Sequence, residues 1–261
     1  MNKVDFLDIS IISHIRIDNP DRLDNFVIRN EFYKEHCINL EFVHVEDGDI
    51  SKCGDAITKD DIHRLTNNTG EYRKNGSYNI GETLTKRKYL LFLDVDCVLD
   101  PNIIKALAES YADTAVVYPY KSVLYSTKKF AKRFQDENQL KILTSSHATD
   151  HGRMFTDSCG GAILMSRDMF VKTGGFNPNF SGWGYEDSEY RDRCLKLGTR
   201  IVRPSENITM LHLYHGYHSF ARNKQALTIE TRKNSQEYKK VLGMNKEQCV
   251  EHMKKWGIYE D

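Results

Sequence analysis

The chain has 261 residues, with 37 lysines and arginines against 37 aspartates and glutamates. That length suits one large α/β domain, or one domain with an appendage. A formal net charge of zero gives no support for a nucleic-acid partner. No apolar run approaches the roughly 20 residues of a membrane span, and the chain does not begin with a signal peptide. The six cysteines are scattered without a Cys-x-x-Cys pair, so we expect reduced thiols in a cytoplasmic protein, and neither a disulfide framework nor a zinc site.

The beginning of the chain predicts a β-α-β unit. Residues 7–13 are a strand candidate, Asn19 and Pro20 are an N-cap and a first-turn proline of a helix, and residues 40–45 are a second strand candidate. Such a unit opens a parallel sheet that can bind a ligand at the carboxyl ends of its strands. The acids Glu46, Asp47 and Asp49 come at the end of the second strand, at that edge.

Residues 51–77 are polar and rich in turn formers, so we expect an irregular segment with at most short helices. Tyr72 stands beside the cations Arg73 and Lys74. This group could stack on a base and contact phosphates. A solvated loop with one packed tyrosine is the more common alternative.

The sharpest chemical signal in this half is Asp94-Val95-Asp96, which follows a predicted helix over 77–88 and an apolar strand over 89–93. On an extended segment both carboxylates point the same way, and they can share a hard divalent cation that bridges phosphate oxygens. The alternative is an ordinary polar turn before the next helix, which begins at Asp100 and Pro101. We favour the metal site because two carboxylates after five apolar residues need a compensating cation or hydrogen bonds.

Further on, residues 115–118 predict a short strand, residues 121–141 a solvated helix with several lysines, and residues 144–156 a polar loop. Beyond the central stretch of the chain, residues 200–203 and 208–213 are strand-like. From residue 223 onward the sequence is polar and helical.

The central stretch combines glycines, one tryptophan and adjacent acids. Gly160 and Gly161 permit a close backbone approach, and residues 162–165 predict a buried strand. A helix beginning at Glu186 would place Glu186 and Asp187 in its first turn, where the macrodipole favours the ionised form of a carboxylate. These acids could be ordinary first-turn residues, and Trp183 could fill the core. The glycines, the tryptophan and the acids together suit a site that binds a sugar ring. The aromatic face would contact the C–H surface of the ring, and the carboxylates would bind its hydroxyls.

Three histidines lie at the end of the last predicted strand and just beyond it, at positions 212, 215 and 218. On a strand His212 and His218 would share one face, while His215 would face the other side or lie in a turn. One imidazole could complete the coordination of a metal on Asp96. Oxygen and nitrogen donors together suit Mn²⁺ or a similar ion better than Ca²⁺. Surface histidines near a turn are the alternative.

The order of these motifs resembles nucleotide-sugar glycosyltransferases of the GT-A fold, most of all the β-1,4-galactosyltransferase and chondroitin-polymerase type. The resemblance covers about residues 7–218. The motif Gly-Trp-Gly-x-Glu-Asp is specific, whereas Asp-x-Asp alone is weak. The matching positions are Asp47, Asn79-Ile-Gly81, Asp94-Val-Asp96, Cys159-Gly-Gly, Gly175-Phe-Asn, Gly182-Trp-Gly-Tyr-Glu-Asp187 and the pair His212 and His215.

The resemblance implies an α/β fold of the GT-A, Rossmann-like type, with a mostly parallel central sheet and helices on both faces. The catalytic domain would cover 1–221, with a nucleotide-binding half over 1–120 and an acceptor and catalytic half over 150–221. A helical C-terminal extension over 222–261 would follow. It could pack on the domain, which we favour, or lie on an anionic membrane.

The resemblance also implies which residues bind the donor. Asp47 would meet the uridine, Tyr72 and Lys74 would contact the base, and Asp94 would lie near the ribose and the metal. The glycine pair at 160 and 161 would border the donor sugar, and Trp183 would lie against both donor and acceptor.

For the acceptor and the metal, the same resemblance implies that Glu186 holds acceptor hydroxyls and that Asp187 is the general base. Asp96 and His215 would bind Mn²⁺ or Mg²⁺, with His212 as a neighbour or substitute. We therefore predict a metal-dependent inverting glycosyltransferase that moves a hexose or N-acetylhexosamine from a UDP-sugar to a hydroxyl of a glycan or lipid-linked glycan.

The sequence departs from the animal galactosyltransferases at two points. Ser158 stands where they carry a bulky tyrosine near the donor sugar. This difference leaves the identity of the donor sugar open, and the smaller residue would admit an N-acetyl group. Their membrane anchor and stem are missing, which favours a bacterial-type cytoplasmic enzyme that builds surface polysaccharide, with possible contact to the inner face of the membrane.

Three other functions remain as alternatives. The first is a retaining transferase of the same fold. The second is a phosphatase of the haloacid-dehalogenase type, whose Asp-x-Asp-x-Val motif matches residues 94–98 but normally ends the first strand of its domain. The third is a non-catalytic sugar-binding module, which would keep the tryptophan and glycines but needs neither metal nor base.

Overall fold

The computed structural model describes residues 3–68, 70, 72–137, 152–216 and 224–258. At its centre lies a seven-stranded sheet in which every neighbouring pair is parallel except those of one strand, β11, which runs antiparallel to both of its neighbours. The predicted mostly parallel sheet is therefore confirmed. Its strands, from edge to edge, are β12 (Arg200–Val202), β8 (Ala115–Val117), β11 (Ala162–Ser166), β6 (Tyr89–Leu93), β2 (Ile9–Ile15), β4 (Glu41–Glu46) and β5 (Ile62–Leu65).

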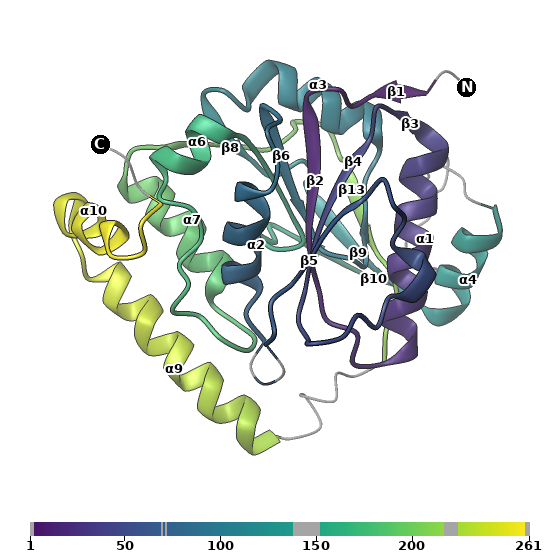
Figure 1. The fold of residues 1–261 in the computed structure, drawn as a ribbon. Coiled ribbons are helices and arrows are strands. Elements are labelled where there is room, and N and C mark those ends of the chain that lie inside the picture. Colours follow the sequence, from purple (N-terminus) through teal and green to yellow (C-terminus); the bar gives the residue numbers. More distant parts are fainter. Residues whose placement is uncertain (1–2, 69, 71, 138–151, 217–223, 259–261) are drawn as a thin grey trace.

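Helices cover both faces of this sheet, as predicted (Figure 1). The alternation of side chains along β2 shows the two faces. Ile12 packs against Gly81 of α2 (Lys74–Thr83), while Ser13 accepts a hydrogen bond from Arg29 of α1 (Pro20–His36) on the opposite side. Because both faces are covered, the central strands β2, β6 and β11 are buried along their whole length. Further along the sheet, α3 (Pro101–Tyr111) and α6 (Arg167–Lys172) pack against β11.

A smaller sheet joins segments that are distant in the sequence, in the order β10 (Gly152–Thr156), β9 (Ser122–Ser126), β13 (Thr209–His212) and β7 (Cys97–Val98). Two of these strands contradict the predictions. Residues 122–126 were expected in a helix, and only α4 (Lys128–Glu137) is helical there; residues 152–156 were expected in a loop. Most residues of β10 are exposed, so its sequence shows no apolar pattern that would predict a strand. Its pairing with β9 defines it as a strand. The rest of both predictions lies outside the described residues.

The segment before the middle strand is also more regular than expected. It contains a short 3₁₀ turn, η1 (Gly54–Ala56), and the edge strand β5, whose residues are only partly buried. Pairing with β4 defines this strand, and its polar sequence gives no apolar pattern. The helix α2 begins at Lys74 and ends at Thr83, earlier than the predicted 77–88. A two-stranded sheet of β1 (Val4–Asp5) and β3 (Cys37–Ile38) completes this half.

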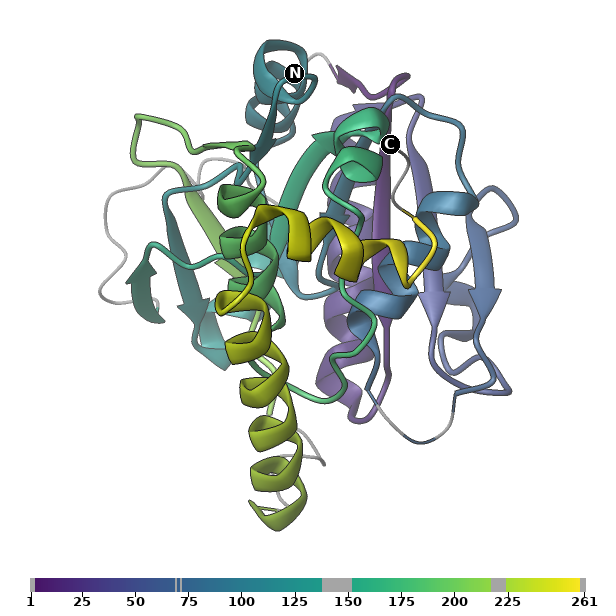
Figure 2. The ribbon, with the colours of Figure 1, turned by 90° about the vertical axis from the view of Figure 1, so that its left-hand side faces the viewer.

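The C-terminal segment forms two helices, α9 (Lys224–Leu242) and α10 (Lys246–Lys254). Figure 2 shows α9 lying along α7 (Glu186–Lys196), with α10 turning back across the domain. Lys196 of α7 donates hydrogen bonds to the carbonyls of Leu242 and Met244 at 2.7 and 2.9 Å. The extension therefore packs on the domain, whereas the boundary at residue 221 stays a prediction. Within the described residues, no helix combines the length and the apolar character that a membrane crossing needs.

Candidate active site

A cavity of about 480 Å³ opens where the carboxyl ends of β2 and β6 meet the N-terminus of α7. Both acid pairs that the sequence singled out, Asp94 with Asp96 and Glu186 with Asp187, line it. The structure thus brings together side chains that lie about ninety residues apart in the chain. The other predicted site residues in its wall are Tyr72, Lys74, Gly160, Gly161, Trp183, His212 and His215.

The Asp-x-Asp segment is a turn, and the expected extended conformation is wrong. β6 ends at Leu93, and the amide of Cys97 donates to the carbonyl of Asp94 at 3.1 Å. The two carboxylates consequently have different partners. Asp94 accepts a 2.6 Å hydrogen bond from the hydroxyl of Tyr78, whereas Asp96 faces two histidines.

Asp96 is the centre of a cluster of nitrogen donors. Its carboxylate lies 3.6 Å from Nε2 of His212, 3.3 Å from Nε2 of His215 and 3.8 Å from a guanidinium nitrogen of Arg22. Burial alone would raise the pKa of Asp96, but the two histidines and Arg22 hold it well below its usual value. The carboxylate is therefore ionised, as a metal ligand must be.

The two histidines present the right nitrogen for a cation. Nδ1 of His212 lies 3.1 Å from the carbonyl of Leu213, and Nδ1 of His215 lies 3.1 Å from the carbonyl of Gly216. A carbonyl only accepts, so each Nδ1 carries a proton, and Nε2, which faces Asp96, is the nitrogen that a neutral ring leaves for a cation. Burial lowers the pKa of His212, which favours this neutral form. Asp96 raises the pKa of His215 against the effect of burial, so a proton and a metal would compete for its Nε2.

Of the two places predicted for His215, the structure fits the one beyond the strand. β13 ends at His212, and His215 lies beyond the strand, yet both rings reach the same carboxylate. His218 lies outside the described residues. The thiol of Cys97 is close to Asp96 and His212, but burial raises its pKa well above the usual value. Sulfur is a softer ligand than Mn²⁺ or Mg²⁺ prefers, so the donors that fit these ions are one carboxylate and two imidazoles.

The second acid pair surrounds a buried lysine. Lys74 places its ammonium 3.0 Å from Oδ1 of Asp187 and 3.2 Å from Oε1 of Glu186. Glu186 also accepts a 2.9 Å hydrogen bond from the amide of Gly184. Burial raises the pKa of Asp187 to about 7, with a further rise from Glu186 and an opposing effect of Lys74. The helix macrodipole favours the ionised form of Asp187, but burial outweighs it.

Two glycines of the central stretch have close neighbours within the protein. A Cβ at Gly160 would overlap Oδ2 of Asp187. Gly161 has φ of +85°, and a Cβ there would lie 2.5 Å from Cε of Met210. Gly160 therefore makes room for the side chain of Asp187, in addition to lining the cavity. Whether the pair borders a donor sugar stays a prediction.

Trp183 is 63% exposed, so the alternative that it fills the core is wrong. It lies between Gly182 and Gly184, both with positive φ, in the loop that leads into α7. An exposed aromatic ring at the rim of a polar cavity is the arrangement expected for a sugar platform.

Asp47 does not reach the cavity wall. Its Oδ2 lies 2.9 Å from Nε2 of His14, and Oδ1 accepts a hydrogen bond from Thr66 at 3.2 Å. His14 does line the cavity, and its ring meets the edge of Tyr72 with centroids 4.8 Å apart. Contacts of Asp47 with uridine, and of Tyr72 and Lys74 with a base, stay predictions. For Lys74 the observed partners are the acids of α7.

Several cavity residues were not singled out from the sequence. His14 and Arg16 stand at the carboxyl end of β2, Arg22 lies in the first turn of α1, and Tyr125 stacks on His212 with ring centroids 4.3 Å apart. Ligands bind at the carboxyl ends of parallel strands, which is the argument that pointed to the acids after β4. The same argument applied to the end of β2 would have found His14 and Arg16. Tyr125 gave no such signal, because its strand was not predicted.

The sequence of the chain is similar to those of glycosyltransferases. Residues 21–254 match the family model described as glycosyltransferase like family 2. The chain is 25% identical over 159 residues to a Drosophila melanogaster protein named "Putative polypeptide N-acetylgalactosaminyltransferase 13", covering 55% of this chain and 28% of that one. It is 33% identical over 64 residues to Drosophila melanogaster beta-1,4-galactosyltransferase 7, covering 23% and 20%. The chain thus spans less than a third of the length of these relatives.

Two solved structures are similar at low identity. The catalytic domain of Drosophila β1,4-galactosyltransferase 7 in complex with xylobiose is 17% identical, with a TM-score of 0.47, over 87% of this chain and 79% of that one. The mannosyltransferase PcManGT from Pyrobaculum calidifontis, in complex with GDP-Man and Mn²⁺, is 16% identical with the same TM-score, over 88% and 64%. Because the family model spans most of the sequence, the chain belongs to the glycosyltransferase-like family 2.

Proposed function

We propose that the protein transfers a hexose or N-acetylhexosamine from a UDP-sugar to a glycan hydroxyl, with inversion at the anomeric carbon. The observation that carries this proposal is the shared cavity: a partly buried acid with a pKa of about 7 and a carboxylate with two imidazoles line the same space. Family membership supports the reaction class. The local similarity to beta-1,4-galactosyltransferases supports a hexose donor.

Asp187 would be the general base. Its pKa of about 7 lets a large fraction be ionised near neutral pH while keeping enough basicity to take a hydroxyl proton. Its neighbour Glu186, held by the amide of Gly184, would accept hydrogen bonds from other acceptor hydroxyls. Trp183 would place its exposed ring against the sugar. Direct displacement of this kind inverts the anomeric configuration, because the acceptor oxygen attacks from the side opposite the leaving group.

Asp96, His212 and His215 would hold Mn²⁺ or Mg²⁺. When bound, the ion supplies positive charge for the departing diphosphate. Arg16 and Arg22 line the same part of the cavity and would add cationic donors for phosphate oxygens. Tyr72 with His14 would form the aromatic wall for the base.

Ser158 supports a tolerant donor subsite. It lines the cavity with a small side chain, and its carbonyl accepts a 3.0 Å hydrogen bond from the hydroxyl of Tyr120 and another from Arg203. The small side chain leaves room that a tyrosine would fill, which supports a donor with either a hydroxyl or an N-acetyl group. We further propose a bacterial surface polysaccharide, free or lipid-linked, as acceptor, made in the cytoplasm at the inner face of the membrane. This last proposal rests on the resemblance alone.

The alternatives differ in what they require. A non-catalytic sugar-binding module needs neither a carboxylate base nor a metal-type donor set in its cavity. The phosphatase mechanism needs a free nucleophilic aspartate, whereas Asp94 accepts a short hydrogen bond from Tyr78. A retaining transferase needs the same donor site and differs only in stereochemistry.

The test is a thermal-shift screen of UDP-sugars with and without Mn²⁺, followed by NMR of the product. We expect one UDP-sugar class to raise the melting temperature only with Mn²⁺, and the product to have the opposite anomeric configuration to the donor. Absence of any nucleotide effect would contradict the transferase assignment. A product with unchanged configuration would establish the retaining alternative.

A further inference from the structure

The C-terminal helix α9 presents one polar face to the loop that carries Trp183. We call residues 177–185 the tryptophan loop. The face of α9 consists of residues spaced by four, seven and eight positions, which lie on one side of a helix. They are Glu230, Asn234, Glu237 and Tyr238.

Asn234 holds the loop at its middle. Its amide nitrogen donates to the carbonyl of Ser181 at 2.9 Å, and its amide oxygen accepts from the amide of the same residue at 3.4 Å. Asn234 is only 2% exposed. A buried side-chain amide that pairs with both backbone groups of one residue fixes that residue firmly, because breaking the pair leaves buried polar groups unsatisfied. Ser181 is two residues before Trp183.

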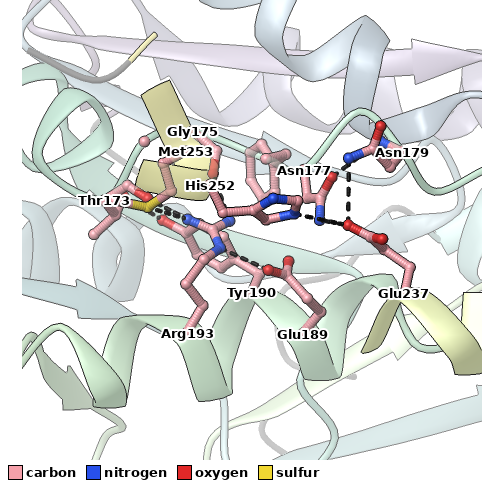
Figure 3. A network of polar contacts seen from close by, with 12 residues as sticks. Thr173, Gly175, Asn177, Asn179, Glu189, Tyr190, Arg193, Glu237, His252 and Met253 are labelled. Carbon is pink, nitrogen blue, oxygen red and sulfur yellow. Dashed lines mark hydrogen bonds and ion pairs between the residues drawn. The ribbon is translucent and has the colours of Figure 1, made fainter. Parts of the chain in front are cut away.

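Glu237 holds the start of the loop, as Figure 3 shows. Its Oε1 accepts hydrogen bonds from Asn177 at 3.0 Å, from Asn179 at 3.3 Å and from His252 of α10 at 2.9 Å. Burial opposes ionisation, but these hydrogen bonds lower the pKa of Glu237 below its usual value, so it is charged at neutral pH. The carbonyl of Asn177 in turn accepts from Asn75 of α2 at 2.9 Å.

The end of the loop lies between α9 and the segment before α2. A Cβ at Gly182 would overlap Oε2 of Glu230, and the amide of Gly182 donates to the carbonyl of Tyr72 at 2.7 Å. Tyr185, with φ of +72°, packs its ring 5.6 Å from that of Tyr238. A non-glycine residue keeps a left-handed conformation only where its surroundings enforce it. The contacts with α9 supply such surroundings.

We propose that this face of α9 is a positioning element of the acceptor site, which sets the tryptophan loop and thereby aims Trp183 and Glu186. The identity of the ligand rests on the proposed glycosyl transfer. Trp183 is expected to face the sugars, whereas the proposed metal ligands Asp96, His212 and His215 lie outside the tryptophan loop. Loosening the loop should therefore weaken the use of the acceptor and spare the binding of UDP itself.

The first test compares Asn234→Ala with Gln236→Ala, a change at an exposed position of the same helix. Steady-state kinetics of the full chain should show kcat/KM for the acceptor falling about tenfold or more in Asn234→Ala. UDP binding with Mn²⁺ should stay within about twofold of the wild type, as should both quantities in Gln236→Ala. Equal losses on the donor and acceptor sides, or no loss for the acceptor, would overturn the proposal.

A double-mutant cycle separates positioning from general destabilisation. If Asn234 acts through the tryptophan, Asn234→Ala made in a Trp183→Ala background should change acceptor kcat/KM by less than about twofold. Additive losses would contradict this route. Glu237→Gln, which keeps an oxygen acceptor for both asparagines, gives a milder second variant if Asn234→Ala does not fold. It should again affect the acceptor and spare UDP.

A readout without catalysis keeps this inference separate from the proposed function. The chain has two tryptophans, so Trp256→Phe leaves Trp183 as the only indole. Time-resolved fluorescence anisotropy should then show faster local motion of Trp183 on adding Asn234→Ala, and no change on adding Gln236→Ala. Faster motion without any UDP-sugar transfer would refute the proposed function and keep the role of α9. Normal UDP-sugar transfer with unchanged anisotropy would keep the proposed function and refute the role of α9.

Discussion

The ammonium of Lys74 lies 3.0 Å from Oδ1 and 3.2 Å from Oδ2 of Asp187, although the two residues are 113 positions apart in the sequence. Lys74 is the first residue of α2, and Asp187 is the second residue of α7. The pair therefore joins the beginnings of two helices at the floor of the cavity. It also places a fixed positive charge on the acid that we propose as the base.

This contact predicts the pH dependence of the reaction. Burial raises the pKa of Asp187 to about 7, while the charge of Lys74 opposes the rise. A base must be unprotonated, so kcat/KM should increase with pH through about 7 and level off above it. Lys74→Met removes the opposing charge, and we expect the rising limb to move to higher pH by roughly one unit or more. A pH series of initial rates measures the rising limb in the wild type and in Lys74→Met.

Lys74→Arg is the matched control, because it keeps the charge and should leave the limb near its original position. Melting temperature and UDP binding with Mn²⁺ show whether each variant is folded. An unchanged limb in folded Lys74→Met would mean that the titrating group is not Asp187.

Asp187→Asn tests the base itself. The amide is nearly isosteric but cannot accept the proton, so kcat should fall by about 10²- to 10⁴-fold. The substitution leaves the proposed metal ligands Asp96, His212 and His215 in place, so metal-dependent UDP binding should be preserved in calorimetry. Asp192→Asn, on the same helix and held by Tyr238 at 2.5 Å, is a control for changes in α7. Turnover near the wild-type rate in Asp187→Asn would remove the assignment.

Features with a local cause were predictable from the sequence. The five apolar residues of β6 gave its bounds, 89–93, and the start of α7 at Glu186 followed from helical spacing. Features that depend on a distant partner were missed. β5 and β10 are strands because of their neighbours β4 and β9, and their own sequences are polar or exposed. The partner of Lys74 belongs to the same class, since nothing near residue 74 indicates an acid from α7.

The candidate site shows the same division. The acids and histidines were recognisable by residue type, and the structure brings them to one cavity. Their local geometry was not predictable, because the turn at residues 94–97 depends on a backbone hydrogen bond that no side-chain pattern reports. The pKa of Asp187 depends on burial in the folded protein, so the sequence indicated only the opposing effect of the helix N-terminus.

The metal cluster predicts a graded loss of Mn²⁺ binding. Asp96→Ala removes the oxygen donor between the two imidazoles, so Mn²⁺-dependent UDP binding and turnover should both be lost. His215→Ala and His212→Ala should each weaken Mn²⁺ by about 10- to 100-fold or more. Electron paramagnetic resonance of free Mn²⁺ measures the affinity directly.

His63→Ala is the matched histidine control, because His63 bonds to Glu46 at 3.0 Å on β4, away from Asp96. It should bind Mn²⁺ as the wild type does. If one of the other two histidine variants also binds normally, that residue is a neighbour of the metal and the remaining pair holds it. Normal binding in Asp96→Ala would exclude this cluster as the metal site.

Gly160→Ala tests whether the glycine serves the base or the donor sugar. A Cβ at this position would overlap Oδ2 of Asp187, so the carboxylate must turn away from its place beside Lys74. We expect kcat to fall by roughly tenfold or more, because a small misplacement of a reacting group is costly, while KM for the UDP-sugar changes little. Gly76→Ala is the control, since a Cβ there has no neighbour within 4 Å. If Gly160→Ala instead raises the donor KM and leaves kcat intact, the methyl group intrudes on the donor subsite, and the glycine is needed for the sugar and not for the base.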